Sequence, residues 1–95
     1  MKRIIKLGPL SVHQPFFLTD CSKAIHFGEQ DGGLYVWVIE DLEKPKEEQH
    51  SYLIVATGAT WEPNYIHEKT FITKQGLVWH LLRERTFLTD GAAIF

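Results

Sequence analysis

The stretch AIHFGEQDGGLYVWVIE, residues 24–40, decides the fold. In its first part, Ile25 and Phe27 share one side of an alternating pattern with a period of two residues, which is typical of a β-strand. The sequence Asp31-Gly32-Gly33 follows, and such residues adopt the positive φ angles that tight hairpin turns require. Residues 34–39 are rich in β-branched and aromatic side chains, which favours a central strand buried on both faces. The stretch therefore predicts a β-hairpin.

Similar strand patterns, separated by turn residues, lie on both sides of this hairpin. The charged segment at 41–49 contains Pro45 and predicts an exposed loop that joins its flanking strands into a second long hairpin. Residues 65–73 alternate loosely, which indicates a β-bulge. We expect an all-β fold, a small antiparallel barrel or sandwich of six to seven strands, with one short C-terminal helix as the alternative for the tail. The predicted strands cover residues 2–7, 15–18, 24–30, 34–39, 51–57, 65–73 and 77–82.

Length and composition indicate one small soluble domain. The chain has 95 residues, 44% of them hydrophobic, and a formal net charge of -2. We expect a single antiparallel β domain at 1–84 and a tail at 85–95, loose or docked on a partner. No apolar run approaches the ~18 residues of a membrane span, and Gly8-Pro9 interrupts the N-terminal segment, so we expect a cytosolic protein that does not bind membranes. The near-balanced charge gives no field that would steer the chain onto nucleic acid.

Sequence motifs for catalysis, metal binding or phosphate binding are missing. No two of the five histidines are three to five residues apart, and Cys21 is the only cysteine, which argues against a zinc site. The serines lie outside any GxSxG signature, and the glycines form no phosphate-binding loop. We therefore expect no catalytic residues, no metal and no cofactor.

Aromatic residues point instead to binding. Three Trp, three Tyr and six Phe are many rings for so short a chain, and Trp61 and Tyr65 fall in a predicted loop, where rings often anchor a partner or stack on a ligand. If both rings wall a pocket, the hydroxyls and backbone of Thr57, Gly58 and Thr60 could bond a flat ligand such as a nucleobase. The alternative is that both rings only cap the end of the core. Trp37 and Trp79 are expected in the core.

Several segments together resemble a family of small uncharacterised proteins found in bacteriophages and prophages. The segments are MKRIIK at 1–6, AIHFGEQDGGLYVWVIED at 24–41, SYLIVATG at 51–58 and QGLVWHLL at 75–82. Ala56 stands in place of the first glycine of the family's GTG segment, and Ala59 stands where relatives often have histidine. The residues that fit the family pattern are Lys2, Ile4, Lys6, Leu10, Gln30, Gly32, Leu34, Trp37, Tyr52, Ile54, Thr57, Gly58, Gly76, Val78, Trp79 and His80.

The resemblance implies a viral accessory protein in the cytoplasm of a host bacterium. The family has no assigned activity that the resemblance could transfer to this chain. We expect stoichiometric binding of a host protein, most directly the inhibition of a host defence component, with loop aromatics and an exposed strand edge as anchors. The same edge would allow a homodimer. One alternative is a binder that sequesters a nucleotide signal near Trp61 and Tyr65. A minor virion or assembly component is the other alternative.

Overall fold

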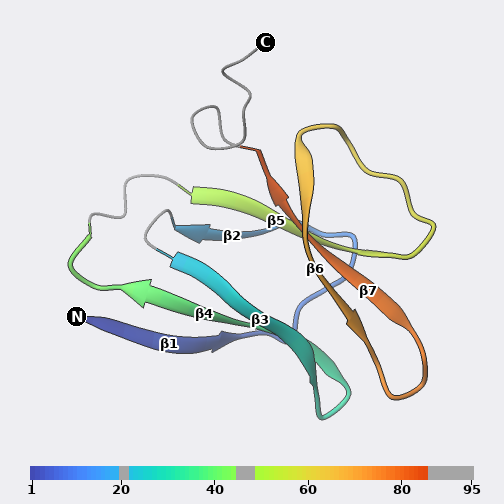
Figure 1. Ribbon diagram of the computed structural model, residues 1–95, viewed down its shortest axis with the longest axis horizontal. Helices are drawn as coiled ribbons and strands as arrows, with labels where there is room; N and C mark the ends of the chain where they lie inside the picture. Colours follow the sequence, from blue (N-terminus) through green and yellow to red (C-terminus); the bar gives the residue numbers. More distant parts are fainter. Residues whose placement is uncertain (20–21, 45–48, 86–95) are drawn as a thin grey trace.

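Seven strands form two antiparallel sheets in the computed structural model, which describes residues 1–19, 22–44 and 49–85 (Figure 1). Sheet A has the order β1-β4-β3 and sheet B the order β2-β5-β7-β6. Within the described ranges no helix occurs, and none is therefore long and apolar enough to cross a membrane. The strands are β1 (Lys2–Leu7), β2 (Phe16–Thr19), β3 (Ser22–Gln30), β4 (Gly33–Asp41), β5 (Gln49–Ala56), β6 (Tyr65–Ile72) and β7 (Val78–Glu84).

The all-β prediction is confirmed, and of the two expected shapes the sandwich is the one found. The two sheets meet over one core and do not close into a barrel (Figure 1). The short helix considered for the C-terminus concerns the tail, of which residues 86–95 lie outside the described part of the chain.

The hairpin of β3 and β4 is confirmed with its predicted turn. Asp31 and Gly32 lie between the paired residues Gln30 and Gly33 and have φ angles of 51° and 82°. Two central residues with positive φ define a two-residue turn whose twist matches that of the flanking strands. A bulge in β3 between Ala24 and His26 shifts the register, and the sequence pattern did not predict it.

The predicted second long hairpin, formed by β4 and β5, is wrong. β4 pairs with β1 on one side and β3 on the other, whereas β5 pairs with β2 and β7 in the other sheet. A strand has only two edges, and β1 and β3 occupy both edges of β4 along its length. β5 therefore has no edge of β4 to pair with. The charged segment between the two strands leads from one sheet to the other, and its residues 45–48 lie outside the described part of the chain. The bulge predicted in 65–73 is present, between His67 and Lys69 of β6.

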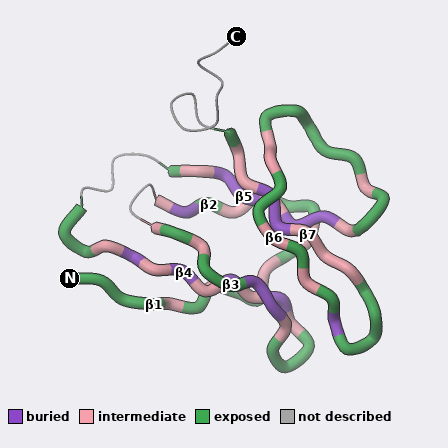
Figure 2. The backbone as a smooth tube through the Cα atoms, viewed as in Figure 1, coloured by how far each residue is buried: buried purple, intermediate pink, exposed green. Residues whose placement is uncertain are grey.

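The core lies between the sheets and takes side chains from both. Along β4, residues 34, 36, 38 and 40 are buried and the residues between them are only half-buried, so the expectation of two buried faces is wrong (Figure 2). Val36 and Val38 of sheet A and Ile54 and Leu81 of sheet B are fully buried. Trp79 packs against this core, but Trp37 lies on the opposite face of β4.

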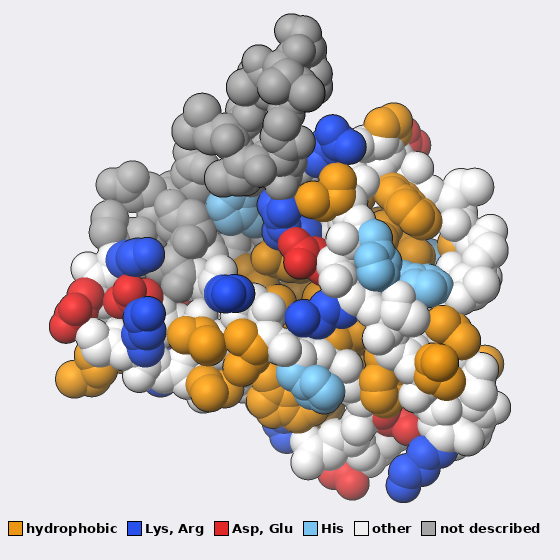
Figure 3. Space-filling view, viewed as in Figure 1, with side chains coloured by type: hydrophobic (Ala, Val, Ile, Leu, Met, Phe, Trp, Pro, Cys, Tyr) orange, Lys and Arg blue, Asp and Glu red, His pale blue; other side chains and the backbone are white. Residues whose placement is uncertain are grey.

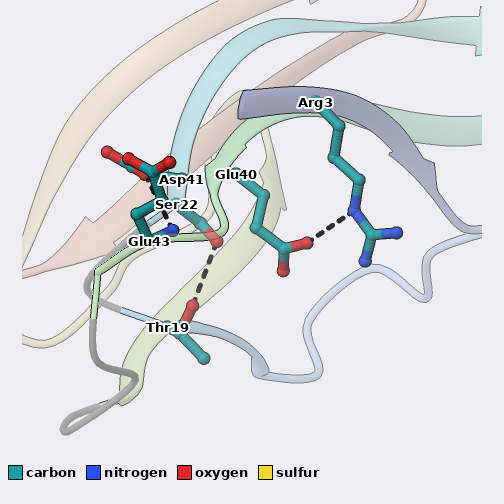
Figure 4. A network of polar contacts seen from close by, with 6 residues as sticks. All are labelled: Arg3, Thr19, Ser22, Glu40, Asp41 and Glu43. Atoms are coloured by element: carbon teal, nitrogen blue, oxygen red, sulfur yellow. Dashed lines mark hydrogen bonds and ion pairs between the residues drawn. The ribbon is translucent and has the colours of Figure 1, made fainter. Parts of the chain in front are cut away.

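One end of the core is closed by polar side chains. Glu40 of β4 points toward the core side, is only 7% exposed and accepts a 2.8 Å hydrogen bond from Nε of Arg3 on β1 (Figure 4). Beside it, the hydroxyls of Thr19 on β2 and Ser22 on β3 are 3.1 Å apart and link the two sheets. A buried carboxylate without a cation would be costly, so Arg3 compensates a charge that the inward position of Glu40 creates.

Leu81 and Leu77 give a matched test of this core. Leu81 is 0% exposed and Leu77 is 56% exposed. We expect Leu81→Ala to lower the free energy of unfolding by about 2–5 kcal/mol, because it leaves a cavity between the sheets. Leu77→Ala should change it by less than about 0.5 kcal/mol. Urea denaturation measures both, and equal effects of the two substitutions would contradict the described core.

Candidate functional site

A pocket of about 250 Å³ opens on sheet B, on the side opposite to Ile54 and Leu81. Strand pairing places His80 opposite Val55 and opposite Thr70, so these side chains share one face, and Thr57 follows two residues after Val55. Figure 3 shows two neighbouring histidine side chains over β6 and β7 on this side of the molecule. The lining residues are Ala56, Thr57, Gly58, Ala59, Trp61, His67, Thr70 and His80.

A chain of four side chains runs along the pocket wall. Oγ1 of Thr57 lies 2.7 Å from Nε2 of His80, and Nδ1 of His80 lies 2.9 Å from Oγ1 of Thr70. The same Thr70 oxygen lies 2.8 Å from Nε2 of His67, and the two imidazole centroids are 5.8 Å apart. A hydroxyl has one hydrogen, so Thr70 donates to one ring only and accepts from the other. The shared hydroxyl therefore couples the tautomers of the two histidines.

The tight turn after β5 brings Thr57 to the pocket. The N–H of Ala59 donates to the carbonyl of Ala56 at 3.1 Å, and the N–H of Thr57 donates to the carbonyl of Val78 at 3.3 Å. Gly58 has a φ of 92°, a backbone conformation that residues with a side chain rarely adopt. Ala56 and Ala59, which also line the pocket, add only small side chains to its wall.

Trp61 also lines the pocket, and a hydrogen bond holds its ring in place. Its indole N–H donates to the carbonyl of Tyr65 at 3.1 Å, while the side chain remains 45% exposed. Tyr65 is itself tied to sheet B, because its hydroxyl lies 2.5 Å from Oγ of the buried Ser51. Two successive hydrogen bonds thus connect the exposed indole to strand β5.

Of the five residues predicted for the site, three line the pocket: Thr57, Gly58 and Trp61. Tyr65 is not part of the lining but accepts the hydrogen bond of the Trp61 indole through its backbone carbonyl, and Thr60 is exposed and also outside the lining. Sequence reasoning missed His67, Thr70 and the role of His80. The missing signal was the strand register, since a bulge at residue 68 is needed to place His67 and Thr70 on the face of His80.

The chemical capacity of the pocket is modest. Both ring nitrogens of His80 are bonded to threonines, which leaves none for a metal ion. No group of three or more His, Cys, Asp or Glu side chains suited to a metal ion occurs among the described residues. Thr57 and His80 have the spacing of a nucleophile and its base. The group behind the base is the neutral hydroxyl of Thr70, however, and not the carboxylate that stabilises an imidazolium in a catalytic triad.

The shared hydroxyl predicts a specific effect of Thr70→Val. This substitution keeps the side-chain shape but removes the hydrogen bonds to both imidazoles. We expect the ring ¹⁵N shifts of His67 and His80 to change together, while those of His13, His26 and His50 stay as they are. Long-range ¹H–¹⁵N NMR spectra measure this, with Thr60→Val as the matched control. Unchanged shifts of His67 and His80 in Thr70→Val would contradict the hydrogen-bonded chain.

Comparison with known proteins places the chain in a family. A family model described as a domain of unknown function, DUF7352, matches residues 1–89, which is most of the chain and extends past Glu84. Neither a curated protein nor a solved structure matches the chain. The expectation of an uncharacterised domain is therefore confirmed. Because the match covers the described strands and the whole pocket, the chain belongs to the DUF7352 family of unknown function.

Proposed function

We propose that this protein acts by stoichiometric binding of another protein, and that its pocket receives one apolar or aromatic side chain of that partner. The observation that carries the proposal is the size and wall of the pocket. Its volume of about 250 Å³ lies below the ~300–1,000 Å³ of typical small-molecule sites. An exposed Trp61 that is already held by Tyr65 can bind a side chain without first being ordered, which lowers the entropic cost of association.

Sequestration of a nucleotide is less well supported by the same pocket. Trp61 offers a ring face for a nucleobase, and Thr57 offers a hydroxyl. Phosphates are usually bound by Arg, Lys or a cradle of backbone N–H groups. The described lining residues include no Lys or Arg, so the phosphates of a nucleotide would extend from the pocket without a cation.

The partner that this proposal implies is a host protein in the cytoplasm of a bacterium, with a bacteriophage or prophage as the source of the chain. The support is the resemblance of the strand and turn segments to phage proteins. Inhibition of a host defence component is the form of binding that this source favours. A virion or assembly role would use the same pocket. The identity of the captured partner distinguishes this role from inhibition of a host protein.

A homodimer joined through strand edges is the weaker form of the binding proposal. The edge strand β1 carries Lys2, Arg3 and Lys6 among its six residues, and the edge strand β6 contains a bulge. Charged residues and bulges on edge strands oppose pairing with another strand. The other edge of sheet B, β2, has only four residues.

Capture of the partner tests the proposal directly. Tagged wild-type protein, Trp61→Ala and Leu77→Ala are each used to isolate complexes from a bacterial host lysate, and proteins and heat-released small molecules are identified by mass spectrometry. We expect one stoichiometric protein with the wild type and with Leu77→Ala, a control at an exposed apolar residue outside the pocket. The binding free energy of this protein for Trp61→Ala, measured by calorimetry, should be weaker than for the wild type by about 2 kcal/mol or more, as for an aromatic hot spot. A released nucleotide without a protein would contradict the proposal and favour sequestration.

The spacing of Thr57 and His80 allows a second test, against an enzymatic function. A fluorophosphonate probe reacts with a hydroxyl that a neighbouring base activates. Because the Thr70 hydroxyl cannot stabilise an imidazolium by charge, we expect the intact mass of the protein to be unchanged after treatment. A single adduct on Thr57 that is lost in His80→Ala would show an activated nucleophile. Binding alone would then not account for the function of the protein.

A further inference from the structure

The outer face of sheet A, turned away from the core, carries an unusual set of side chains. Strand pairing arranges them in rows across β1, β4 and β3, because residues that face each other across an antiparallel pair point to the same side. One row contains Ile4, Ile39 and Lys23, and the next contains Lys6, Trp37 and His26. The rows at the two ends are Lys2 with Asp41, and Tyr35 with Gly28.

The centre of this face is apolar and open. Ile4 is 63% exposed, and Ile39 and Trp37 beside it are only half-buried. Figure 3 shows hydrophobic side chains together with Lys or Arg and a histidine over β1, β3 and β4. Contiguous apolar side chains rimmed by polar ones are the usual composition of a protein-binding surface.

The rim of this face is cationic. None of Lys2, Lys6 and Lys23 has a carboxylate at ion-pair distance within the described part of the chain. Lys6 donates to Oε1 of Gln30 at 2.7 Å, which leaves its charge uncompensated. Asp41, the acidic residue in these rows, accepts a hydrogen bond from the N–H of Glu43. Three lysines against one aspartate give the described rows of this face a net positive charge, although the whole chain has a formal charge of -2.

We infer that the outer face of sheet A is a second contact surface, and that its occupant is a protein segment with apolar side chains flanked by Asp or Glu. The inference rests on the proposed function, since it supplies the chemistry of the same kind of partner. Apolar side chains of the segment would pack on Ile4, Ile39 and Trp37, and its carboxylates would meet Lys2 and Lys23.

The arrangement of the rings disfavours single-stranded nucleic acid as the occupant, because neighbouring side chains already occupy part of the ring surface. Base stacking needs free ring faces. The Nζ of Lys6 lies 4.9 Å from the Tyr35 centroid, over its ring, and the His26 ring lies 5.1 Å from the Trp37 ring at a tilt of 56°. A second copy of the chain is also disfavoured, because its face would carry the same net positive charge.

The three tryptophans give separate reporters for a test by NMR. Trp37 lies on the outer face, Trp61 in the pocket and Trp79 against the core. The probe is a synthetic 14-residue peptide with Leu and Phe on one face and Glu around them, and the control peptide has Lys at every Glu position. We expect the Glu peptide to move the indole N–H signal of Trp37 but not that of Trp79, whereas a shift of Trp61 would report entry of a Leu or Phe side chain into the pocket. The Lys peptide should leave the Trp37 signal in place.

Two pairs of variants separate the roles of charge and apolar contact. Lys23→Glu should weaken binding of the Glu peptide about fivefold, and added salt should weaken it in the wild type. Lys74→Glu makes the same change of charge away from the face and should have no effect. Ile4→Ser removes an exposed apolar contact and should also weaken binding, while Leu77→Ser, at an exposed apolar residue away from this face, should not.

Three results would overturn the inference. They are a shift of Trp61 in place of Trp37, equal binding of the Glu and Lys peptides, and no shift at any indole up to millimolar peptide. Each leaves the proposed function of the pocket intact, because that function is tested by Trp61→Ala on the captured partner. If Trp61→Ala loses capture of the partner while the Glu peptide still shifts the Trp37 indole signal, both the pocket and the outer face of sheet A bind.

Discussion

The register of β4 is the constraint on which the rest of the structure depends. Its even-numbered residues reach the core, where Val36 and Val38 are fully buried, and its odd-numbered residues form the outer face of sheet A. The turn at Asp31 and Gly32 sets this register, since a slip by one residue would exchange the two sets of side chains. The slip would bury Trp37 between the sheets and expose the two valines, so both the core and the proposed second contact surface follow from one turn.

The pocket depends on a similar constraint in sheet B. His80 meets Thr57 and Thr70 because β7 lies between β5 and β6 and presents one face to both neighbours. The bulge in β6 brings His67 to the same hydroxyl. Two segments that carry the family resemblance, 51–58 and 75–82, thus contribute hydrogen-bonded partners at 2.7 Å. The site is a product of strand pairing between distant parts of the chain.

The sequence was sufficient for local structure and insufficient for pairing between distant segments. The alternation of β3 and the turn residues predicted the first hairpin, and Gly58 with Trp61 located the pocket loop. The separation of β4 and β5 into different sheets could not be read, because it depends on β1 and β3 occupying both edges of β4. Trp37 was expected in the core because an apolar run does not reveal which face of a sheet is left open. His67 and Thr70 were missed because the loose alternation predicted a bulge in 65–73 without its position, and that position decides which residues share the face of His80.

The central claim is that the pocket is formed before any partner arrives, with Trp61 fixed by Tyr65 and Tyr65 by Ser51. The most direct test is the ¹⁵N order parameter of the Trp61 indole N–H in the free protein. A value of about 0.85, equal to that of rigid backbone, is predicted because the donor is bonded to a carbonyl at the start of β6. A value below about 0.6 would show that the indole moves freely, and the preformed pocket would then be contradicted.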